Sequence, residues 1–440
     1  MKQLEFELEL KQETDHFSNL SYNKKLENLT RCDLSFIGKN GRNSLHNVHS
    51  FPAKFPPLLP NTFIKELTEE NDIVLDPMMG SCTTLIEALR LKRIAYGCDI
   101  DPLSILIAKA KLSSINVAEV FQTGKSVGNK AFKNFSNNKQ KIEKEILRFF
   151  DEKTLSFINY WFMKETQLEL FALVQQINKL EDNQIKNFLR LIISSIIVTK
   201  SGGVSLATDL AHTRPHIAKD KSPSSAFEEF NKKLSSILKN YIPLDNPVFN
   251  IFHSDAKAIP LETNSVDLII TSPPYANNAI DYLRAHKFSL VWFGHSLESI
   301  SEVRNDFIGN GSFKGKEFLQ LPISCMKIIN KVKEVDKQKG LALHRYYTEM
   351  SRVIQEMYRV IKPLKTVVIV VASSVIKGVD TLTHECLINI GNEIGFKLIG
   401  INQRQLDRDR RMMPTRWKRD ETSQIETRMH EEHVIILQKS

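Results

Sequence analysis

Residues 73–101 read IVLDPMMGSCTTLIEALRLKRIAYGCDID, and this stretch decides the fold class. It starts with a short apolar strand pattern at 73–75, followed by a small-residue turn and a helix pattern at 83–91. A second strand pattern follows at 93–97, and another helix is predicted from 102 to about 111. Strands that alternate with helices at this spacing predict right-handed βαβ units and a parallel sheet.

The turn after the first strand has the composition of a ligand-binding loop. Its small residues let the backbone approach a ligand beyond the end of the strand, and the next helix presents its amino terminus there. About 20 residues further on, Asp99 ends the second strand, at the usual spacing for an acceptor of ribose hydroxyls. The candidate ligand-binding residues of this half are Asp76, Pro77, Met78, Gly80, Ser81, Thr83, Thr84, Asp99 and Ile100.

The acidic residue at the end of the first strand helps to choose between two nucleotide ligands. The turn contains no G-x-G-x-x-G motif, which is typical of dinucleotide sites. The Asp76 carboxylate would repel a pyrophosphate, but it could receive an ammonium group. These features favour the zwitterionic methionine end of S-adenosylmethionine over a dinucleotide.

A second motif follows the buried-strand pattern VDLIIT at 266–271, which runs directly into Ser272-Pro273-Pro274-Tyr275. Two consecutive prolines cannot continue a central strand, so the chain must leave the sheet rigidly. The Ser272 side chain and the Pro273 carbonyl could accept the two hydrogens of a nucleobase amine and expose its lone pair to a methyl donor. Tyr275 could stack on the base, which must first leave the duplex.

The chain as a whole is predicted to be an α/β protein in four segments. Helical periodicities rich in Lys, Asn and Gln interrupt the alternation after residue 112, and strand patterns resume at 248–252. Two neighbouring strand patterns at 397–401 and 433–438 predict an antiparallel edge of the sheet. We expect a polar, loosely packed lead-in at 1–45, a cofactor-binding half at 46–112, a helical insertion at 113–245, and a catalytic half at 246–440 with an inserted target-contacting segment at 295–342.

The composition is that of an ordinary globular protein of 440 residues, because 42% are hydrophobic and 25% are charged. Apolar stretches such as 191–198 are much shorter than the roughly 18 to 20 residues that span a bilayer. The amino terminus lacks the apolar core of a signal peptide, so a cytoplasmic protein is expected. The five cysteines are far apart, which argues against a zinc site and a disulfide framework, and no metal is expected.

The net charge of +9 suits a polyanionic partner, because Lys and Arg displace counterions from phosphates. The segment after Tyr275 and the loop between the last two strands both emerge at the carboxyl edge of a parallel sheet. Their basic residues with interleaved aromatic residues suit phosphate contact and stacking, although a solvated charged face has the same composition. The candidate DNA-binding residues are Arg284, Lys287, Arg408, Arg410, Arg411, Arg416 and Lys418. His286 and His344 are expected to be structural or to contact DNA, because methylation of an amine needs no strong base.

These motifs together resemble the amino-methylating DNA methyltransferases, and more narrowly those that act on N4 of cytosine. The residues 49–57 (HSFPAKFPP) are similar to the family motif before the first strand, 76–84 to its glycine-rich cofactor motif, and 254–256 (SDA) to the segment whose Asp meets the adenine amine. The residues 271–275 match the catalytic motif in its Ser form, which is commoner among N4-cytosine enzymes. Adenine-N6 enzymes usually carry Asp or Asn at the Ser272 position. Further cofactor-binding residues implied by the resemblance are Phe51, Ala53, Lys54, Asp255, Ala256 and Thr271.

The resemblance implies the class I S-adenosylmethionine-dependent methyltransferase fold, a Rossmann-like and mostly parallel seven-stranded sheet, here with a large helical insertion. Two residues depart from the family pattern. Cys82 and Leu364 stand where the family usually has Gly.

The activity that the resemblance implies is sequence-specific methylation of cytosine N4, with one base flipped out of double-stranded DNA. Such an enzyme would be the modification half of a restriction-modification system, with a cognate restriction endonuclease as its partner. An adenine-N6 DNA methyltransferase, an RNA amine methyltransferase and a non-catalytic DNA-binding subunit that keeps the fold are the alternatives.

Overall fold

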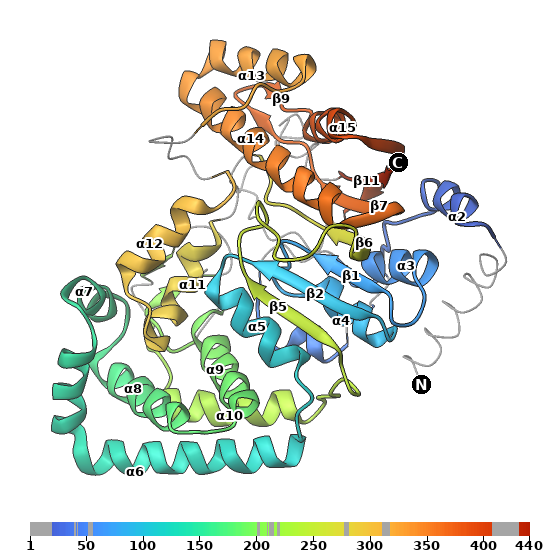
Figure 1. The fold of residues 1–440 in the computed structure, drawn as a ribbon. Coiled ribbons are helices and arrows are strands. Elements are labelled where there is room, and N and C mark those ends of the chain that lie inside the picture. The colour runs from blue at the N-terminus through green and yellow to red at the C-terminus, as the bar shows by residue number, and fades with distance from the viewer. Residues whose placement is uncertain are drawn as a thin grey trace.

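A seven-stranded sheet forms the centre of the protein, and helices cover both of its faces (Figure 1). The computed structural model describes residues 20–38, 41, 43–51, 56–199, 203–208, 210, 215–217, 221–276, 281–309, 317–406 and 431–440. In spatial order, the strands are β5 (Phe249–His253), β2 (Ile94–Asp99), β1 (Ile73–Asp76), β6 (Val266–Thr271), β7 (Ile361–Val371), β11 (Glu431–Lys439) and β10 (Phe396–Gln405).

The strand directions define the fold class. The neighbours from β5 to β7 pair in parallel, and β11 runs antiparallel to both β7 and β10. The last strand in the sequence is therefore inserted antiparallel between the two strands that precede it. This order is that of the class I S-adenosylmethionine-dependent methyltransferases, which confirms the predicted fold class and the antiparallel edge.

The central strand β6 shows why its residues form a strand. All six of its residues are buried, and a strand covered on both faces has a nearly continuous apolar sequence. The exception is Asp267, whose carboxylate forms an ion pair with Lys362 Nζ at 2.8 Å and accepts the Ile73 amide hydrogen at 3.0 Å. The one charged side chain in β6 is therefore paired, as burial of a charge requires.

Two apolar clusters fill the two sides of the sheet. The helices that bury residues in the first cluster include α2 (Tyr22–Leu29), α3 (Leu58–Leu67), α4 (Thr83–Arg90) and α5 (Pro102–Leu112), together with the insertion. Those of the second cluster are α13 (Ile323–Val335), α14 (Lys337–Val360) and α15 (Thr383–Ile394). The sheet is thus the middle of three layers (Figure 1).

Within its described residues, the stretch between β2 and β5 contains five helices after α5, and a short β3–β4 pair. Their bounds are α6 (Val117–Phe149), α7 (Glu152–Trp161), α8 (Lys164–Asn178), α9 (Asn183–Ile197), β3 (Ala207–Thr208), β4 (His216–Ile217) and α10 (Ala226–Leu238). The periodicity predicts a helix only from 142 in the first of these, whereas α6 begins at Val117. The early turns of α6 bury small residues, because a Cβ on Gly124 would lie 2.5 Å from Leu234 Cδ2 on α10. Glycine at a buried helix position weakens the apolar pattern on which sequence prediction depends.

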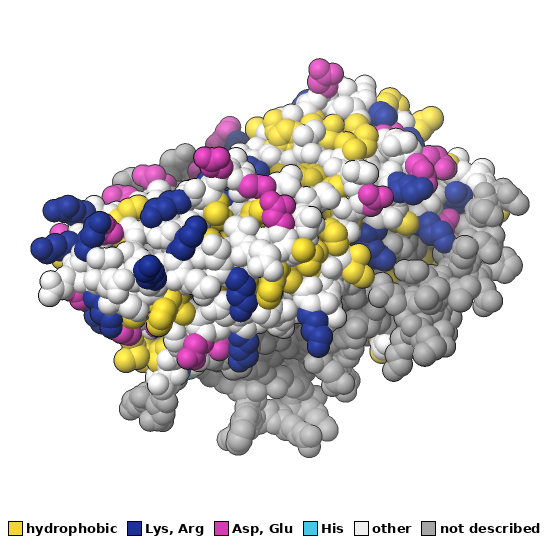
Figure 2. All heavy atoms as spheres, turned by 90° about the horizontal axis from the view of Figure 1, so that it is seen from below, with side chains coloured by type: hydrophobic (Ala, Val, Ile, Leu, Met, Phe, Trp, Pro, Cys, Tyr) yellow, Lys and Arg dark blue, Asp and Glu magenta, His cyan; other side chains and the backbone are white. Residues whose placement is uncertain are grey.

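The insertion packs against the segment that follows the catalytic strand. This segment contains α11 (Tyr282–Leu290), η2 (Val291–Phe293) and α12 (Leu297–Asp306). The Trp292 ring lies 5.7 Å from Phe150 and 5.2 Å from Phe162, in edge-to-face contacts. On the side where α6 lies, Lys and Arg side chains are interspersed with acidic and apolar ones (Figure 2), and some are paired, as Lys139 is with Glu165 at 2.6 Å.

The amino-terminal segment differs from its sequence prediction. The polar composition predicts loose packing, but α2 buries Leu26 and Leu29. The Tyr22 hydroxyl shares a 2.8 Å hydrogen bond with Thr366, and Asn402 Nδ2 donates to the Leu29 carbonyl at 3.0 Å. These partners are more than 300 residues away in the chain, so a local pattern could not reveal them. Among the residues that the structure describes, no helix is both long and apolar enough to cross a membrane.

Candidate active site

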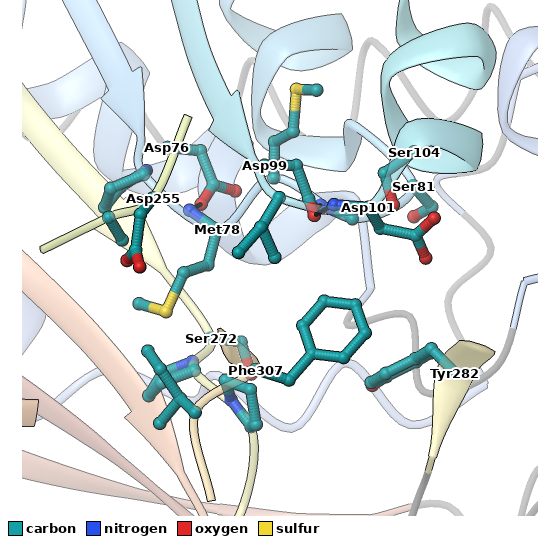
Figure 3. Close-up of a pocket in the computed structure, with 18 of the residues that line it drawn as sticks. Asp76, Met78, Ser81, Asp99, Asp101, Ser104, Asp255, Ser272, Tyr282 and Phe307 are labelled. Atoms are coloured by element: carbon teal, nitrogen blue, oxygen red, sulfur yellow. Dashed lines mark hydrogen bonds between the residues drawn. The ribbon is translucent and has the colours of Figure 1, made fainter. Parts of the chain in front are cut away.

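A cavity of about 310 Å³ opens at the carboxyl ends of β1, β2 and β6. In Figure 3, Asp76, Asp99, Asp101 and Asp255 lie along one side of it, and Ser272, Phe307 and Tyr282 lie along the other. The sequence places these residues far apart, but the carboxyl ends of parallel strands meet at one edge of a sheet. The structure therefore brings both predicted motifs to one cavity.

Asp76 is buried at the end of β1. Its carboxylate accepts hydrogen bonds from Thr271 Oγ1 at 2.8 Å, from Thr84 Oγ1 at 2.9 Å and from the Met78 amide at 3.2 Å. Burial raises the pKa of Asp76 to about 6, although the threonine hydrogen bonds act in the opposite direction. The predicted residues Thr84 and Thr271 thus hold Asp76 and do not line the cavity themselves.

Asp99 organises the turn that follows β1. One carboxylate oxygen accepts the Gly80 amide at 2.8 Å, and the other accepts the Asp101 amide at 2.9 Å. Burial, and then the neighbouring Asp101 charge, raise the pKa of Asp99 to about 7. Gly80 has a φ of +45°, and a Cβ there would lie 3.3 Å from the Phe51 ring, so the turn needs glycine at this point.

The departure from the family pattern at Cys82 has a structural counterpart. Cys82 has a φ of +61°, in the left-handed region that favours glycine. Its thiol is buried, and the chain around it is held by the buried Lys111 ammonium, which donates to the Ser81 carbonyl at 3.2 Å. Leu364, the second departure, also has a positive φ, of +62°. Both residues therefore adopt a left-handed backbone conformation, which costs a glycine less than any other residue.

Ser272, Pro273, Pro274 and Tyr275 line the cavity directly after β6. The Ser272 side chain is half-buried, and no hydrogen bond of its hydroxyl is found within the described part of the chain. The Tyr275 hydroxyl donates to Glu432 Oε1 at 2.6 Å. The Thr271 hydroxyl, one residue before the turn, is the direct link between the catalytic strand and Asp76.

An aromatic wall closes another side of the cavity. The Phe51 ring lies 5.5 Å from Tyr282 and 5.2 Å from His286, which is buried on α11. His286 Nδ1 lies 2.5 Å from Asp101 Oδ2, and the other oxygen of Asp101 caps α5 by accepting the Leu103 amide at 2.8 Å. Of the two roles expected for His286, these contacts support the structural one.

The segment after α12 brings Phe307 and Ile308 to the cavity. A buried ion pair on α14 holds this segment. Arg345 Nη2 donates to the Asn305 carbonyl at 2.9 Å and lies 2.9 Å from Glu349, whose other oxygen accepts the Gly309 amide at 3.0 Å. The inserted segment 295–342 thus reaches the cavity beside Ser272 (Figure 3).

The remaining predicted residues fall into two groups. Asp255 and Ala256 line the cavity after β5, and Asp255 Oδ2 pairs with Lys257 Nζ at 2.9 Å. Of the candidate DNA-binding residues, Arg284 lines the cavity, whereas the Lys287 ammonium lies 5.1 Å from the Phe157 ring centre on α7. The predicted residues outside the described part of the chain are Ala53, Lys54, Arg408, Arg410, Arg411, Arg416 and Lys418.

Sequence reasoning missed several residues of the cavity, which are Met79, Asp101, Ser104, Asp281, Tyr282, Arg304, Asp306, Phe307 and Ile308. Asp101 carried a signal, because an Asp before Pro at the start of a helix is a typical amino-terminal cap. Met79 lies within the turn after β1, which the sequence did mark, although this residue was not singled out. The others come from α5, from α11 and its amino-terminal cap, from α12 and from the residues directly after α12, and no local motif marks them. Among the described residues, no cluster of three or more His, Cys, Asp or Glu side chains is arranged to hold a metal ion.

The chain is similar to known DNA methyltransferases. A sequence profile of the N6- and N4-type DNA methylases matches residues 2–110. The type II methyltransferase M.MvaI of Kocuria varians is 24% identical over 80% of this chain and 81% of its own length. M.BsoBI of Geobacillus stearothermophilus, also a type II methyltransferase, is 24% identical over 72% of this chain and 63% of its own. A solved S-adenosylmethionine-dependent methyltransferase of Methanosarcina mazei aligns with 86% of this chain and 96% of its own length, at 10% identity and a TM-score of 0.31. This likeness is low, and the fold class rests on the strand order instead.

The fold and the site define a methyltransferase of the class I type. Within that class, the chain is similar to the amino-methylating DNA methyltransferases, the family that acts on N4 of cytosine or N6 of adenine.

The cofactor of this family is S-adenosylmethionine, and the cavity fits it. Its ammonium and sulfonium groups are cationic. Asp76 is a buried carboxylate and Asp99 a half-buried one; both have raised pKa values, and neither has a basic side chain among the hydrogen-bond partners that the structure describes for it. A cationic ligand that carries ribose hydroxyls supplies the charge and the donors that these two groups lack. Gly80 also lines the cavity, so its backbone is accessible to the cofactor there.

Proposed function

We propose that this protein methylates N4 of cytosine within a specific sequence of double-stranded DNA, as the cytoplasmic modification enzyme of a restriction-modification system. The observation that carries the proposal is Ser272, whose half-buried side chain lines the cofactor cavity directly after β6. The Ser form of the motif is typical of N4-cytosine enzymes. The similarity to proteins named type II methyltransferases supports the biological context.

In this proposal, each residue around the cavity binds a different part of the cofactor. Asp76 receives the ammonium group, Asp99 accepts the ribose hydroxyls, and Asp255 accepts the adenine amine. Phe51 packs beside the methionine portion, next to Gly80. When bound, S-adenosylmethionine supplies an electrophilic methyl group on a sulfonium.

The catalytic turn prepares the nucleophile. The amine nitrogen of cytosine is a poor nucleophile because its lone pair is delocalised into the ring. Ser272 Oγ and the Pro273 carbonyl accept its two hydrogens, which holds the nitrogen towards tetrahedral geometry and turns the lone pair to the methyl group. Tyr275 stacks on the flipped base, and the two rigid prolines fix the positions of these groups relative to one another.

The experiment that tests the base is expression in a methylation-free host, followed by genome sequencing with a method that separates N4-methylcytosine from N6-methyladenine. N4-methylcytosine at one recurrent sequence supports the proposal. N6-methyladenine at a recurrent sequence refutes the base assignment but keeps the activity, and unmodified DNA from a well-expressed protein refutes both.

Purified variants test the role of Ser272. Ser272→Ala is expected to lower turnover about 100-fold or more, the usual effect of removing one preorganised transition-state hydrogen bond. Binding of the cofactor should change little, because Ser272 holds the base. Ser265→Ala is the matched control, since Ser265 directly precedes β6 and bonds to the Glu262 carbonyl at 2.7 Å, at the opposite end of the strand from Ser272. Equal loss of turnover in both variants would contradict the assignment.

A further inference from the structure

The catalytic turn is tied to the antiparallel edge of the sheet by one side-chain hydrogen bond. The Tyr275 hydroxyl donates to Glu432 Oε1 at 2.6 Å, although the two residues are 157 positions apart. Glu432 is the second residue of β11, and its side chain is buried. The contact therefore joins the end of β6 to a strand that lies beyond β7 in the sheet.

Glu432 has a charged neighbour on the adjacent strand. Arg404 of β10 pairs with Glu432 in the strand register, and its Nη1 lies 3.4 Å from Glu432 Oε2. Both side chains are buried, and within the described part of the chain Oε2 has no hydrogen-bond partner. The shorter contact of Glu432 is thus with the phenol. A buried ion pair adds little net stability, so its value here lies in geometry.

The hydrogen bond restricts the Tyr275 ring at its far end. The near end is fixed by the two prolines before it, and a tyrosine ring has only two side-chain torsions. With both ends held, the plane of the ring is set before any base arrives. Burial, followed by the Glu432 charge, raises the pKa of the Tyr275 phenol well above its ordinary value, so the phenol remains a donor throughout the working pH range.

The preceding residue of β11, Glu431, does not share this arrangement. Glu431 pairs with Gln405 of β10, whose Nε2 donates to it at 2.8 Å, and with Gln403. These are exposed contacts, away from Tyr275. Two consecutive glutamates on one strand, with side chains on opposite faces, provide a matched pair for experiment.

We propose that Glu432, supported by Arg404, is a positioning residue that sets the ring plane of Tyr275 for stacking on the target base. Glu432 acts through Tyr275 and touches neither base nor cofactor. This inference rests on the proposed function, because it assigns a role in the same transfer to DNA.

The test compares initial rates of methyl transfer for the variants Glu432→Ala, Glu432→Gln, Tyr275→Phe and Glu431→Ala on DNA that contains the target sequence. Glu432→Ala is expected to lower kcat about 10- to 100-fold, the scale of effect that a small misplacement of a reacting group produces. Glu432→Gln should recover most of the loss, because the amide oxygen still accepts from the phenol. Tyr275→Phe should match Glu432→Ala, and the double variant should lose no more than either single one.

Three results would overturn the inference. These are wild-type kcat in both Glu432→Ala and Tyr275→Phe, additive losses in the double variant, and an equal loss in Glu431→Ala. If Glu432→Ala does not fold, Tyr275→Phe decides alone, because it keeps the ring and the Glu432–Arg404 pair. An inactive wild-type protein would instead refute the proposed function, whereas an active wild type with unaffected variants refutes only the inference. Cofactor affinity, measured in parallel, should stay unchanged in every variant.

Discussion

The hydrogen bond from Thr271 to Asp76 provides the sharpest prediction, because it joins the catalytic strand to the cofactor carboxylate. Replacing Thr271 by Val keeps the shape of a buried β-branched side chain but removes the 2.8 Å hydrogen bond. The hydroxyl favours the ionised carboxylate, so its loss should raise the pKa of Asp76 further. An ammonium ligand needs Asp76 ionised, and its affinity should therefore become more sensitive to pH.

The magnitude follows from the hydrogen-bond energy. A hydrogen bond to a charged group contributes about 1.5 kcal/mol at the lower end of its range, and about 1.4 kcal/mol corresponds to one pKa unit. Thr271→Val should thus move the pKa of Asp76 up by roughly one unit from its present value of about 6. The dissociation constant relative to wild type should then rise about twofold at pH 7, about eightfold at pH 5.5, and not measurably at pH 8.5.

The direction of the pH effect can be checked independently. A carboxyl group with a raised pKa loses its charge as the pH falls through that pKa. Its affinity for a cation is therefore at its full value at pH values above the pKa and weakens as the pH falls below it. Asp99, whose pKa is about 7, titrates in both proteins, and the ratio of their dissociation constants removes its contribution.

Isothermal titration calorimetry with S-adenosylhomocysteine measures these constants, because this product carries the same ammonium and ribose groups. Thr366→Val is the matched control, since Thr366 is also a buried threonine of the sheet but its hydroxyl bonds to Tyr22. A ratio that does not change with pH, or that grows towards alkaline pH, would refute the assignment of Asp76 to the ammonium group.

Three further predictions concern stability. Arg345→Met should lower the free energy of unfolding by about 3 to 5 kcal/mol in urea titrations, because it leaves the Glu349 carboxylate buried without its partner, and changing Glu349 to Leu as well should recover part of the loss. Leu364→Gly should raise that free energy by up to about 1 kcal/mol, because glycine relieves the left-handed backbone of an exposed residue at a smaller entropic cost; a decrease would mean that the leucine side chain contributes more than the strain. Gly97→Ala should cost about 1 to 3 kcal/mol in thermal unfolding, because its Cβ would lie 2.6 Å from Leu85 Cδ2, and an unchanged midpoint would show that the leucine can move aside.

Much of the sheet could be predicted because its signals are local. The strand pattern at 266–271 matches β6 residue for residue, since the buried apolar run is contained within the segment. The first half of α6 escaped prediction because close packing on α10 places glycine where an apolar residue would otherwise mark the buried face. The packing of α2 depends on partners at the other end of the chain.

The candidate site divides in the same way. Asp76, Asp99 and Ser272 could be found because each ends a strand, and the order of the chain already places such ends at one edge of the sheet. Phe307 could not be found, since it reaches the cavity only through the clamp that Arg345 and Glu349 provide. The two departures from the family pattern were visible as residue types, but their positive φ values appear only in the folded backbone.

By itself, the sequence determined the fold class, the cofactor half and the catalytic turn, because strand, turn and helix patterns are properties of neighbouring residues. Only the tertiary structure decided which distant side chains meet around them. The contact between Tyr275 and Glu432 is the clearest case, because it exists only when the last strand of the chain enters the sheet antiparallel beside β7. The physical reason is that a hydrogen bond depends on the separation of two atoms in space, and sequence separation says nothing of it until the strands have paired.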